Sequence, residues 1–157
     1  MMGQLKPQQI ENLISHQFIG RLGCHANGKV YVIPISYVYD GTDIYAFSKE
    51  GMKLQMMRKN PNVCLQIDNL GVLDNWESVI LWGTFEELND PIERTEALIL
   101  LMNRILPVVT SEMLRISPHW PFPSDHPENI DGVVYRIKVS EKTGRFERHA
   151  EEHFFAY

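Results

Sequence analysis

Two turn signals divide residues 18–48 into three strand-like runs. The segment reads FIGRLGCHANGKVYVIPISYVYDGTDIYAFS, and β-branched and aromatic residues recur between the turns. Asn27-Gly28 and Asp40-Gly41 are dipeptides that tight hairpin turns favour, because these residues tolerate a positive φ. The segment therefore predicts an antiparallel three-stranded meander. In such a sheet each strand pairs with the one that follows it in the chain.

One residue of this meander does not suit a fully paired strand. Pro34 stands in the middle of YVIPISY, residues 31–37, and proline has no backbone N–H to donate. Within sheets it is confined to an edge, a bulge or a place where the neighbour is something other than a strand. The last alternative is of functional interest, since a bound molecule would then take the place of the missing neighbour.

Three further segments carry helical patterns. Residues 7–17 begin with a proline suited to a first helical turn, residues 50–60 end before Pro61, and residues 92–106 follow an Asp-Pro start signal. The spacing of apolar residues in the third helix predicts a stripe that is buried against the core. This stripe comprises Ile92, Leu98, Ile99, Met102 and Ile105.

Strand-like runs return at residues 62–68, 76–88 and 133–148, and the last of these contains a Thr-Gly turn signal. About six antiparallel strands with two or three helices predict a small β-barrel or strongly curled sheet in an α+β domain. Residues 1–157 are expected to form one domain, since this length suits a single core. The glycines at the expected bends of the barrel are Gly20, Gly23, Gly71 and Gly83.

A long proline-rich loop is expected between the last helix and the last strand. Residues 107–132 contain five prolines, and Trp120, Phe122, His119 and His126 lie among them. Loops of this length in a compact domain are usually functional or interfacial. Two interpretations remain open: the aromatic residues cover a ligand, or they seal the end of the barrel.

Composition narrows the range of partners and locations. The net charge of −5 argues against nucleic-acid binding, which usually needs a basic excess. No apolar run is long enough to cross a membrane, and the polar first residues argue against a signal peptide, so a cytoplasmic protein is expected. Cys24 and Cys64 have no CxxC spacing, so both are expected to be buried thiols within strands.

Two motif matches are weaker than they look. Gly23 to Lys29 fits the GxxxxGK core of a phosphate-binding loop, but Val30 follows where Ser or Thr must bind magnesium, so a hairpin is favoured. His149 and His153 have the i, i+4 spacing of a metal pair on a helix. We favour exposed tail residues over this reading and predict no metal site.

The junction IYAFSKEGMKL, residues 44–54, has the features of a phosphate-binding turn. A strand is expected to end near Phe47 and a helix to begin soon after, with Ser48, Lys49, Gly51 and Lys53 at the junction. Helix N-termini offer unpaired N–H groups and a partial positive charge, which attract anions. The alternative is a solvated helix start with an ordinary serine cap.

The order of these motifs resembles one family of flavoproteins. The chain from GRLGCHANGKVYVIPISYVYDGTDIYAFSKEGMKLQMMRKNPNVCLQID through SVILWGTFEEL to VVYRIKVSEKTGRFE is similar to the pyridoxamine 5′-phosphate oxidase-like split-barrel proteins. Within them it is most similar to the nitroimidazole-resistance reductase branch. The resemblance implies an α+β fold with an antiparallel six-stranded split β-barrel and flanking helices. It also implies a homodimer that binds FMN in a cleft between the subunits.

The resemblance also implies the residues that contact FMN. The strand lies along the flavin ring, the turn binds the phosphate, and Ser78 reaches the flavin from the next long strand. Separately from the resemblance, Trp120 of the proline-rich loop is a candidate to cover the flavin, with sealing of the barrel end as the alternative. In this sequence the ring and phosphate residues are Val32, Ile33, Pro34, Ile35, Ser36, Phe47, Ser48, Lys49, Met52 and Lys53.

Departures from the family pattern limit what carries over. Pyridoxamine phosphate oxidases have Arg-Lys where this chain has Met52 and Lys53, so Lys49 or Arg21 would have to supply the missing charge. Phe47 replaces a histidine of some nitroimidazole-resistance relatives. The C-terminal tryptophan and Arg-x-His that bind pyridoxamine phosphate have no counterpart, so that reaction is not expected.

The resulting hypothesis is an oxidoreductase that passes electrons from a nicotinamide through FMN to a small electron-poor acceptor, such as a nitroaromatic. No catalytic residue is assigned. Three alternatives remain open: a non-catalytic flavin-binding or sensing module, a haem-handling split barrel that uses the C-terminal histidines, and a deazaflavin protein.

Overall fold

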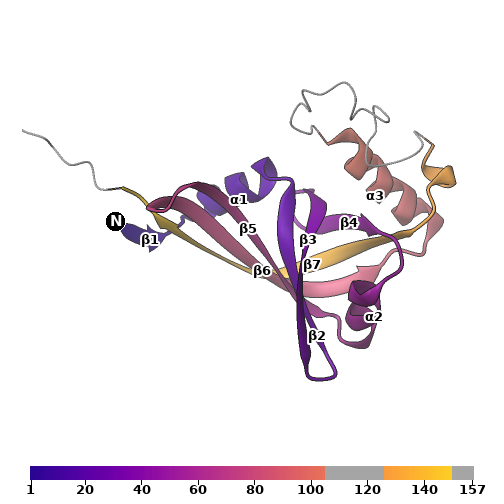
Figure 1. Ribbon diagram of the computed structural model, residues 1–157. Coiled ribbons are helices and arrows are strands. Elements are labelled where there is room, and N and C mark those ends of the chain that lie inside the picture. Colours follow the sequence, from indigo (N-terminus) through magenta and orange to yellow (C-terminus); the bar gives the residue numbers. More distant parts are fainter. Residues whose placement is uncertain (105–125, 150–157) are drawn as a thin grey trace, which may run out of the picture.

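The computed structural model describes residues 1–104 and 126–149. A single curled sheet forms the body of the protein, and the helices lie around it (Figure 1). In chain order the elements are β1 (Met2–Gln4), α1 (Pro7–His16), β2 (Ile19–Ala26), β3 (Lys29–Tyr39), β4 (Ile44–Ser48), α2 (Met52–Lys59), β5 (Asn62–Val72), β6 (Asn75–Glu87), α3 (Pro91–Asn103), the 3-10 turn η2 (Pro127–Asn129) and β7 (Val133–Glu147).

The strand β7 closes the sheet into a barrel. The strand order is β1-β7-β4-β3-β2-β5-β6, every pairing is antiparallel, and β7 also pairs with β6. Strands β2 to β7 therefore form a ring of six, with β1 added to the far part of β7. The β2–β5 and β3–β4 pairings are only three residue pairs long, so the barrel is split there. The expected α+β class and six-stranded antiparallel split barrel are confirmed.

The expected meander forms around the first turn signal. Asn27 and Gly28 have φ values of 52° and 74° between β2 and β3, as a two-residue hairpin turn requires. At the second signal, the Asp40 carboxylate accepts hydrogen bonds from the N–H groups of Thr42 and Asp43. Local turn chemistry thus sets the register of β2, β3 and β4.

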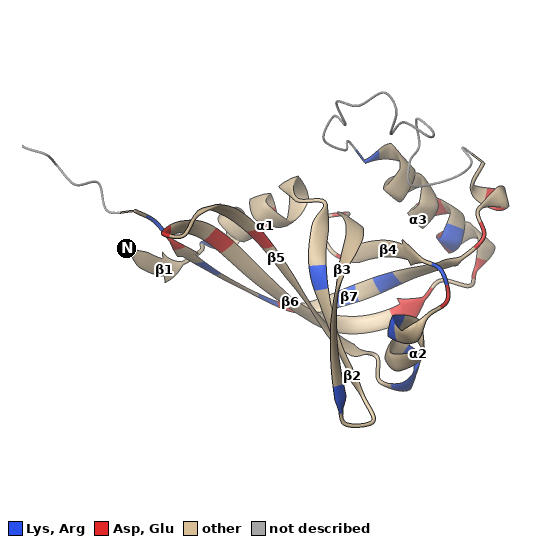
Figure 2. Cartoon of the chain, viewed as in Figure 1, with Lys and Arg blue, Asp and Glu red and all other residues tan. Residues whose placement is uncertain are grey.

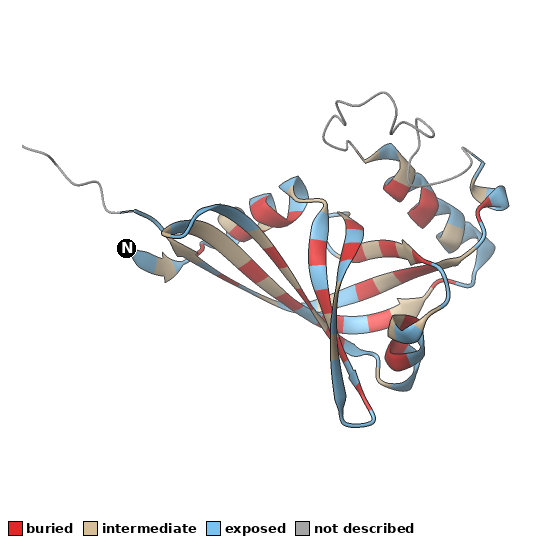
Figure 3. Cartoon of the chain, viewed as in Figure 1, coloured by how far each residue is buried: buried red, intermediate tan, exposed pale blue. Residues whose placement is uncertain are grey.

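The main hydrophobic core fills the barrel, and α1 closes one end of it. Buried and exposed positions alternate along the strands, as a barrel with one inner and one outer face demands (Figure 3). Ile10, Leu13 and Ile14 of α1 face the core, and the Tyr37 hydroxyl donates to the Ile14 carbonyl at 2.7 Å. Among the described residues, no helix is long and apolar enough to cross a membrane.

The buried stripe predicted for the third helix is largely wrong. The residues of α3 that are buried are Ala97, Leu98 and Leu101, which pack in a second, smaller cluster over β4 and β7. Ile92 and Ile99 are 70% and 44% exposed, because the helix meets the sheet through a narrow face that neither residue shares. Met102 packs at the edge of this cluster, and Ile105 lies outside the described residues.

Two smaller expectations also fail. No turn interrupts β7 at Thr143-Gly144, because that glycine allows the close approach of α1: a Cβ there would lie 2.8 Å from Ile10 Cγ1. Cys24 is buried, but Cys64 is only half-buried, since its side chain faces outward on β5.

Candidate functional site

Pro34 lies on an open strand edge. Strand β3 pairs with β2 from Lys29 to Ser36 but with β4 only from Tyr37 to Tyr39. The Tyr37 N–H donates to the Phe18 carbonyl, and backbone N–H and C=O groups alternate in direction along a strand. The odd-numbered residues of β3 therefore direct these groups toward β2, whereas Pro34 and Ser36 direct theirs to the opposite side. No strand within residues 1–104 and 126–149 pairs with that side. The missing N–H of proline therefore costs no ladder hydrogen bond.

Side chains from four strands form one outward surface beside this edge. Register pairs align Pro34 with Arg21, Arg21 with Gln66, and Asp68 with Ser78. We call this surface the outer platform and define it by Val32, Pro34, Ser36, Arg21, Gln66 and Ser78. Of the five predicted ring residues, Ile33 and Ile35 point toward the core instead. Those two can offer a ligand only their backbone.

A polar network crosses the outer platform. The Arg21 guanidinium donates to both carboxylate oxygens of Asp68 at 3.0 Å. The Gln66 amide nitrogen donates to Asp68 Oδ2 and to Ser78 Oγ, each at 2.9 Å. Arg21 is therefore paired with a carboxylate, which corrects its suggested role as a spare phosphate cation.

An apolar hollow adjoins the platform toward the β2–β3 turn. It has a volume of about 310 Å³, and Val30, Val32, Cys64 and Trp82 are among the residues that line it. Val30 and Val32 are 71% and 62% exposed, which is unusual for neighbouring valines on one face. Strand β3 carries no charged residue after Lys29 (Figure 2). The surface thus offers apolar contact next to a few fixed polar groups.

The turn from Phe47 to Lys53 begins one residue after Ala46, the last residue of β4 that pairs with β3. Ser48 is 7% exposed, and its hydroxyl donates to the Lys49 carbonyl at 2.8 Å, so it is not the ordinary helix cap that the alternative interpretation required. The N-cap residue of α2 is Gly51, and no side chain caps the helix there. A Cβ at Gly51 would meet nothing within 4 Å. The first N–H groups of α2 are therefore open to a ligand.

Lys53 is the cation of this turn. Burial lowers the pKa of its ammonium group below the ordinary value, and the described part of the chain gives it no carboxylate partner. A half-buried cation without a counter-charge is unfavourable unless a ligand supplies the charge. Lys49 and Met52 are exposed beside it. The turn thus fits a phosphate group.

Phe47 has a structural role that the sequence did not reveal. Its ring fills the space next to Gly132, whose φ is 139°, and a Cβ on that glycine would lie 2.5 Å from the ring. The loop before β7 therefore packs closely on the phosphate-type turn. This contact also explains why an aromatic residue suits position 47.

Arg104 is a residue of interest that sequence reasoning missed. Its guanidinium donates to the Tyr37 carbonyl at 3.0 Å, and its buried Nε has no hydrogen-bond partner. Burial lowers the pKa of the group from its ordinary value. This contact joins the end of α3 to β3 one residue after Ser36, and no sequence motif indicates it.

Several predicted residues lie outside the described residues: Trp120, His119, Phe122 and His153. His149 contacts Asp74 at the far end of the barrel. Within the described ranges, no group of three or more metal-ligating side chains is present.

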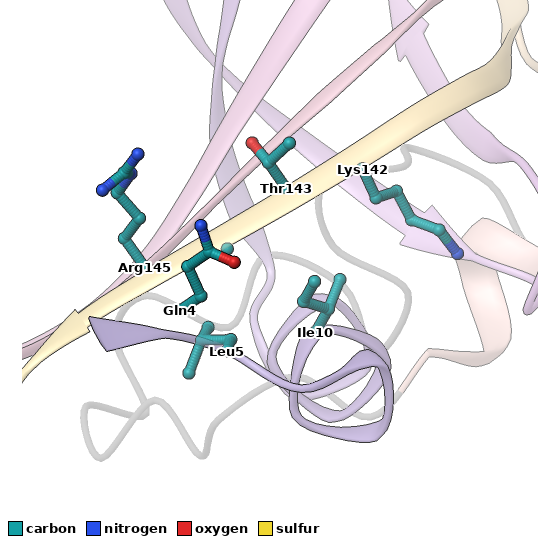
Figure 4. Close-up of a pocket in the computed structure, with 7 residues that line it drawn as sticks. Gln4, Leu5, Ile10, Lys142, Thr143 and Arg145 are labelled. Carbon is teal, nitrogen blue, oxygen red and sulfur yellow. The ribbon is translucent and has the colours of Figure 1, made fainter.

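A second cavity, of about 260 Å³, lies between β1, α1 and β7 (Figure 4). Gln4 and Thr143 border it, and Arg145 lies at its rim. Lys142 turns its ammonium away from Gln4, toward Glu11 and Tyr39, with which it interacts. Lys142 is therefore already neutralised, which leaves Arg145 as the cation at the rim of this cavity.

Comparisons with known proteins agree with this fold. A crystal structure of an FAD-binding protein from Mesorhizobium loti is 29% identical, covers 93% of this chain and 98% of its own, and superposes with a TM-score of 0.71. The same fold occurs in a proposed 5-nitroimidazole antibiotic resistance protein from Bacteroides thetaiotaomicron, with 22% identity, coverage of 93% and 89%, and a TM-score of 0.70. An uncharacterized protein of Rhizobium meliloti is 28% identical over 149 residues, 88% of this chain and 90% of the relative.

A family model described as pyridoxamine 5′-phosphate oxidase matches residues 6–146. That range includes the open edge of β3, the outer platform and the turn at Lys53. The chain therefore belongs to the pyridoxamine 5′-phosphate oxidase family.

Proposed function

We propose that this protein binds FMN, with the flavin ring along the open edge of β3 and the phosphate at the turn from Ser48 to Lys53. The observation that carries the proposal is the juxtaposition of an unpaired strand edge around Pro34 with the turn that places Lys53 on α2. The edge offers backbone groups to a polar ring edge, and the turn offers N–H groups and a positive charge. The Mesorhizobium loti protein, named as FAD-binding, supports a flavin.

We choose FMN over FAD because of the size of the turn. One uncapped helix end and one half-buried lysine suit one terminal phosphate group. A second phosphate and an adenosine would need further cations or an aromatic platform at the turn. Met52 stands where a second cation would be most useful.

The proposed activity is electron transfer from a nicotinamide to a small electron-poor acceptor, such as a nitroaromatic. The bound flavin supplies hydride or electron transfer, while the chain binds and orients it. The residues of the outer platform hold one face of the ring, and Trp82 and Val32 limit the access of water beside it. The polar network fixes the few hydrogen-bonding groups on this face.

We also propose that a second copy of the chain covers the apolar hollow. Val30, Val32 and Trp82 leave apolar surface exposed there, and such surface is usually buried by a partner. A self-complementary contact across a two-fold axis would enclose two equivalent flavins. The homodimer is thus part of the same site.

The decisive experiment is to purify the protein, record its absorbance spectrum and identify the bound molecule by mass. We expect two flavin bands and the mass of FMN. Anaerobic stopped-flow mixing with NADH or NADPH should then bleach the flavin, and a nitroaromatic should restore the colour. FAD in the mass spectrum would refute the choice of FMN, and a Soret band would indicate haem. Bound FMN that no nicotinamide reduces would favour the non-catalytic flavin module.

A further inference from the structure

The polar network of the outer platform has a fixed direction of hydrogen bonding. Asp68 is a carboxylate and only accepts hydrogen bonds, and the Arg21 guanidinium only donates them. Both oxygens of Asp68 accept from Arg21 Nη1 at 3.0 Å, which holds the carboxylate in one orientation. The side chain of Asp68 is only 16% exposed, so water competes weakly for it.

The carboxylate in turn fixes the orientation of the Gln66 amide. An amide oxygen facing Asp68 would place two acceptors together, so the NH₂ group must face it. Gln66 Nε2 donates to Asp68 Oδ2 at 2.9 Å and to Ser78 Oγ at 2.9 Å. Both amide hydrogens are thereby used, and Ser78 Oγ accepts one of them.

The hydroxyl hydrogen of Ser78 is then left to point elsewhere. Among the described residues, no acceptor for it is present, and Ser78 is half-buried. Its side chain borders a cavity of about 180 Å³ that Trp76, Ile80, Thr143 and Arg145 also line. Space for a ligand atom therefore lies next to a serine whose hydroxyl hydrogen is available to it.

We propose that Arg21, Asp68 and Gln66 are positioning residues that turn the Ser78 hydroxyl hydrogen toward the bound ligand, so that Ser78 donates to it. The ligand group that this arrangement favours is an acceptor, such as a carbonyl oxygen or an unprotonated ring nitrogen of the polar part of a flavin. This inference rests on the proposed function, since it assigns the flavin ring to the outer platform. It adds three residues whose importance no sequence motif indicates.

A double-mutant cycle with Asp68→Asn and Ser78→Ala tests the relay. Asparagine keeps the shape but can donate to Gln66, so the amide is free to flip and to accept the serine hydrogen. We expect Asp68→Asn to weaken flavin binding about five-fold, the scale of one neutral hydrogen bond. In the Ser78→Ala background the same change should alter affinity less than two-fold. Equal effects of Asp68→Asn in both backgrounds would overturn the relay.

Fluorescence titration with both FMN and riboflavin separates positioning from charge. Asp68→Asn removes a negative charge, which acts on the FMN phosphate but much less on uncharged riboflavin. A positioning effect should appear with both ligands, and an effect confined to FMN would contradict it. Glu86→Gln is the matched control, because it breaks the ion pair with Arg136 at 2.7 Å, away from the outer platform.

Gln66→Glu in the Asp68→Asn background provides a second test, in which no second carboxylate lies 2.9 Å away to share a proton. A carboxylate at position 66 then accepts but cannot donate, so it should capture the Ser78 hydrogen and lower riboflavin affinity to the level of Ser78→Ala. Unchanged riboflavin affinity would sink the proposal. A wild-type protein that binds neither flavin would refute the proposed function itself, whereas binding without coupling in the cycle refutes only the relay. Circular dichroism of each variant shows that it is folded.

Discussion

At the scale of single residues, the buried charge of Lys53 destabilises the ligand-free protein and is expected to stabilise the complex with a phosphate. Burial lowers the pKa of its ammonium group because desolvation disfavours the charge. A bound phosphate would reverse this effect, since it restores a counter-charge next to the ammonium. The Lys53 ammonium group should therefore raise the affinity for the ligand and lower the stability of the free protein.

We expect Lys53→Met to weaken FMN binding by about 10- to 100-fold, since a charge-assisted hydrogen bond is worth about 1.5–3 kcal/mol. The same variant should raise the unfolding free energy of the ligand-free protein slightly, by about 0.5 kcal/mol, the usual scale for half-exposed positions. Titration calorimetry and urea denaturation measure the two effects. Lys59→Met, at the other end of the same helix, is the control, and equal losses of affinity in both variants would contradict the assignment.

Pro34 should matter more for the ligand than for the fold. Its nitrogen faces the open edge of β3, so Pro34→Val restores an N–H without breaking a ladder bond. We expect the thermal midpoint to change little, because exposed substitutions of this kind usually cost less than about 0.5 kcal/mol. The spectrum and affinity of bound FMN should change, since a new donor faces the ring. A variant with an unchanged flavin spectrum would place the ring elsewhere.

Single residues were also where sequence reasoning was least complete. The motif at Ser48 and Lys53 is local, so its place at a strand-to-helix junction could be predicted. Arg21 and Asp68 are 47 residues apart, and only the pairing of β2 with β5 brings them together. Nothing in a single sequence indicates such a register, so the network that orients Ser78 was missed.

At the scale of elements, a polar cluster fastens α1 to the barrel. The Tyr39 hydroxyl donates to Glu11 Oε2 at 2.6 Å, and the Lys142 ammonium donates to Glu11 and to the Tyr39 hydroxyl at 3.2 Å. Burial acts to raise the pKa of Glu11, but hydrogen bonds from Lys142 and Tyr39 outweigh it, so the pKa lies below the ordinary 4.5. One carboxylate thus joins α1 to both β3 and β7.

This cluster predicts a pH-dependent contribution to stability. A carboxyl group with a lowered pKa in the folded state stabilises the fold above its ordinary pKa, and the contribution is lost as the pH falls through the lowered value. Glu11→Gln should therefore lower the unfolding free energy by about 1 kcal/mol at pH 7. The two proteins should converge as the pH falls below 4.5. A difference that stays constant in denaturation curves across this range would show that the charge is irrelevant.

Elements with strong local signals could be predicted, and those defined by tertiary contacts could not. The hairpin at Asn27-Gly28 follows from the turn residues themselves. The buried face of α3 depends on which side meets β4 and β7, and its exposed Ile92 and Ile99 misled a purely periodic interpretation. Gly144 looked like a turn residue because the sequence does not show that α1 lies against it.

At the scale of the whole molecule, the proposed homodimer makes a sharp prediction. Trp82→Arg places a charge in the apolar hollow, so it should convert a dimer to a monomer and lower flavin retention together. Size-exclusion chromatography with light scattering measures the first effect, and the absorbance ratio of flavin to protein measures the second. Leu73→Arg is the control, because that residue is 98% exposed at the β5–β6 turn. A variant that stays dimeric would move the interface to another face.

The barrel class was predictable because six strand-like runs, three of them joined by tight turn signals, leave few other architectures. The closure of the barrel by β7 was less visible, since the partners of this strand are distant in sequence. Glu86 and Arg136, for example, are 50 residues apart and pair across β6 and β7. The phosphate-type turn could be located from the sequence because its residues are contiguous. Its position relative to the outer platform could not, because the platform combines residues of four strands that only the folded sheet brings together.

The position of β7 also has a consequence for biosynthesis. Residues 133–147 pair with β4, β6 and β1, and all three precede them in the chain. Until a ribosome has released this segment, the edges of β4 and β6 have no partner and can pair with other nascent chains. Because β7 is synthesised after β1 to β6, its docking is the step that covers these edges and protects the barrel from aggregation. Holdase chaperones should therefore bind the nascent chain until β7 has emerged.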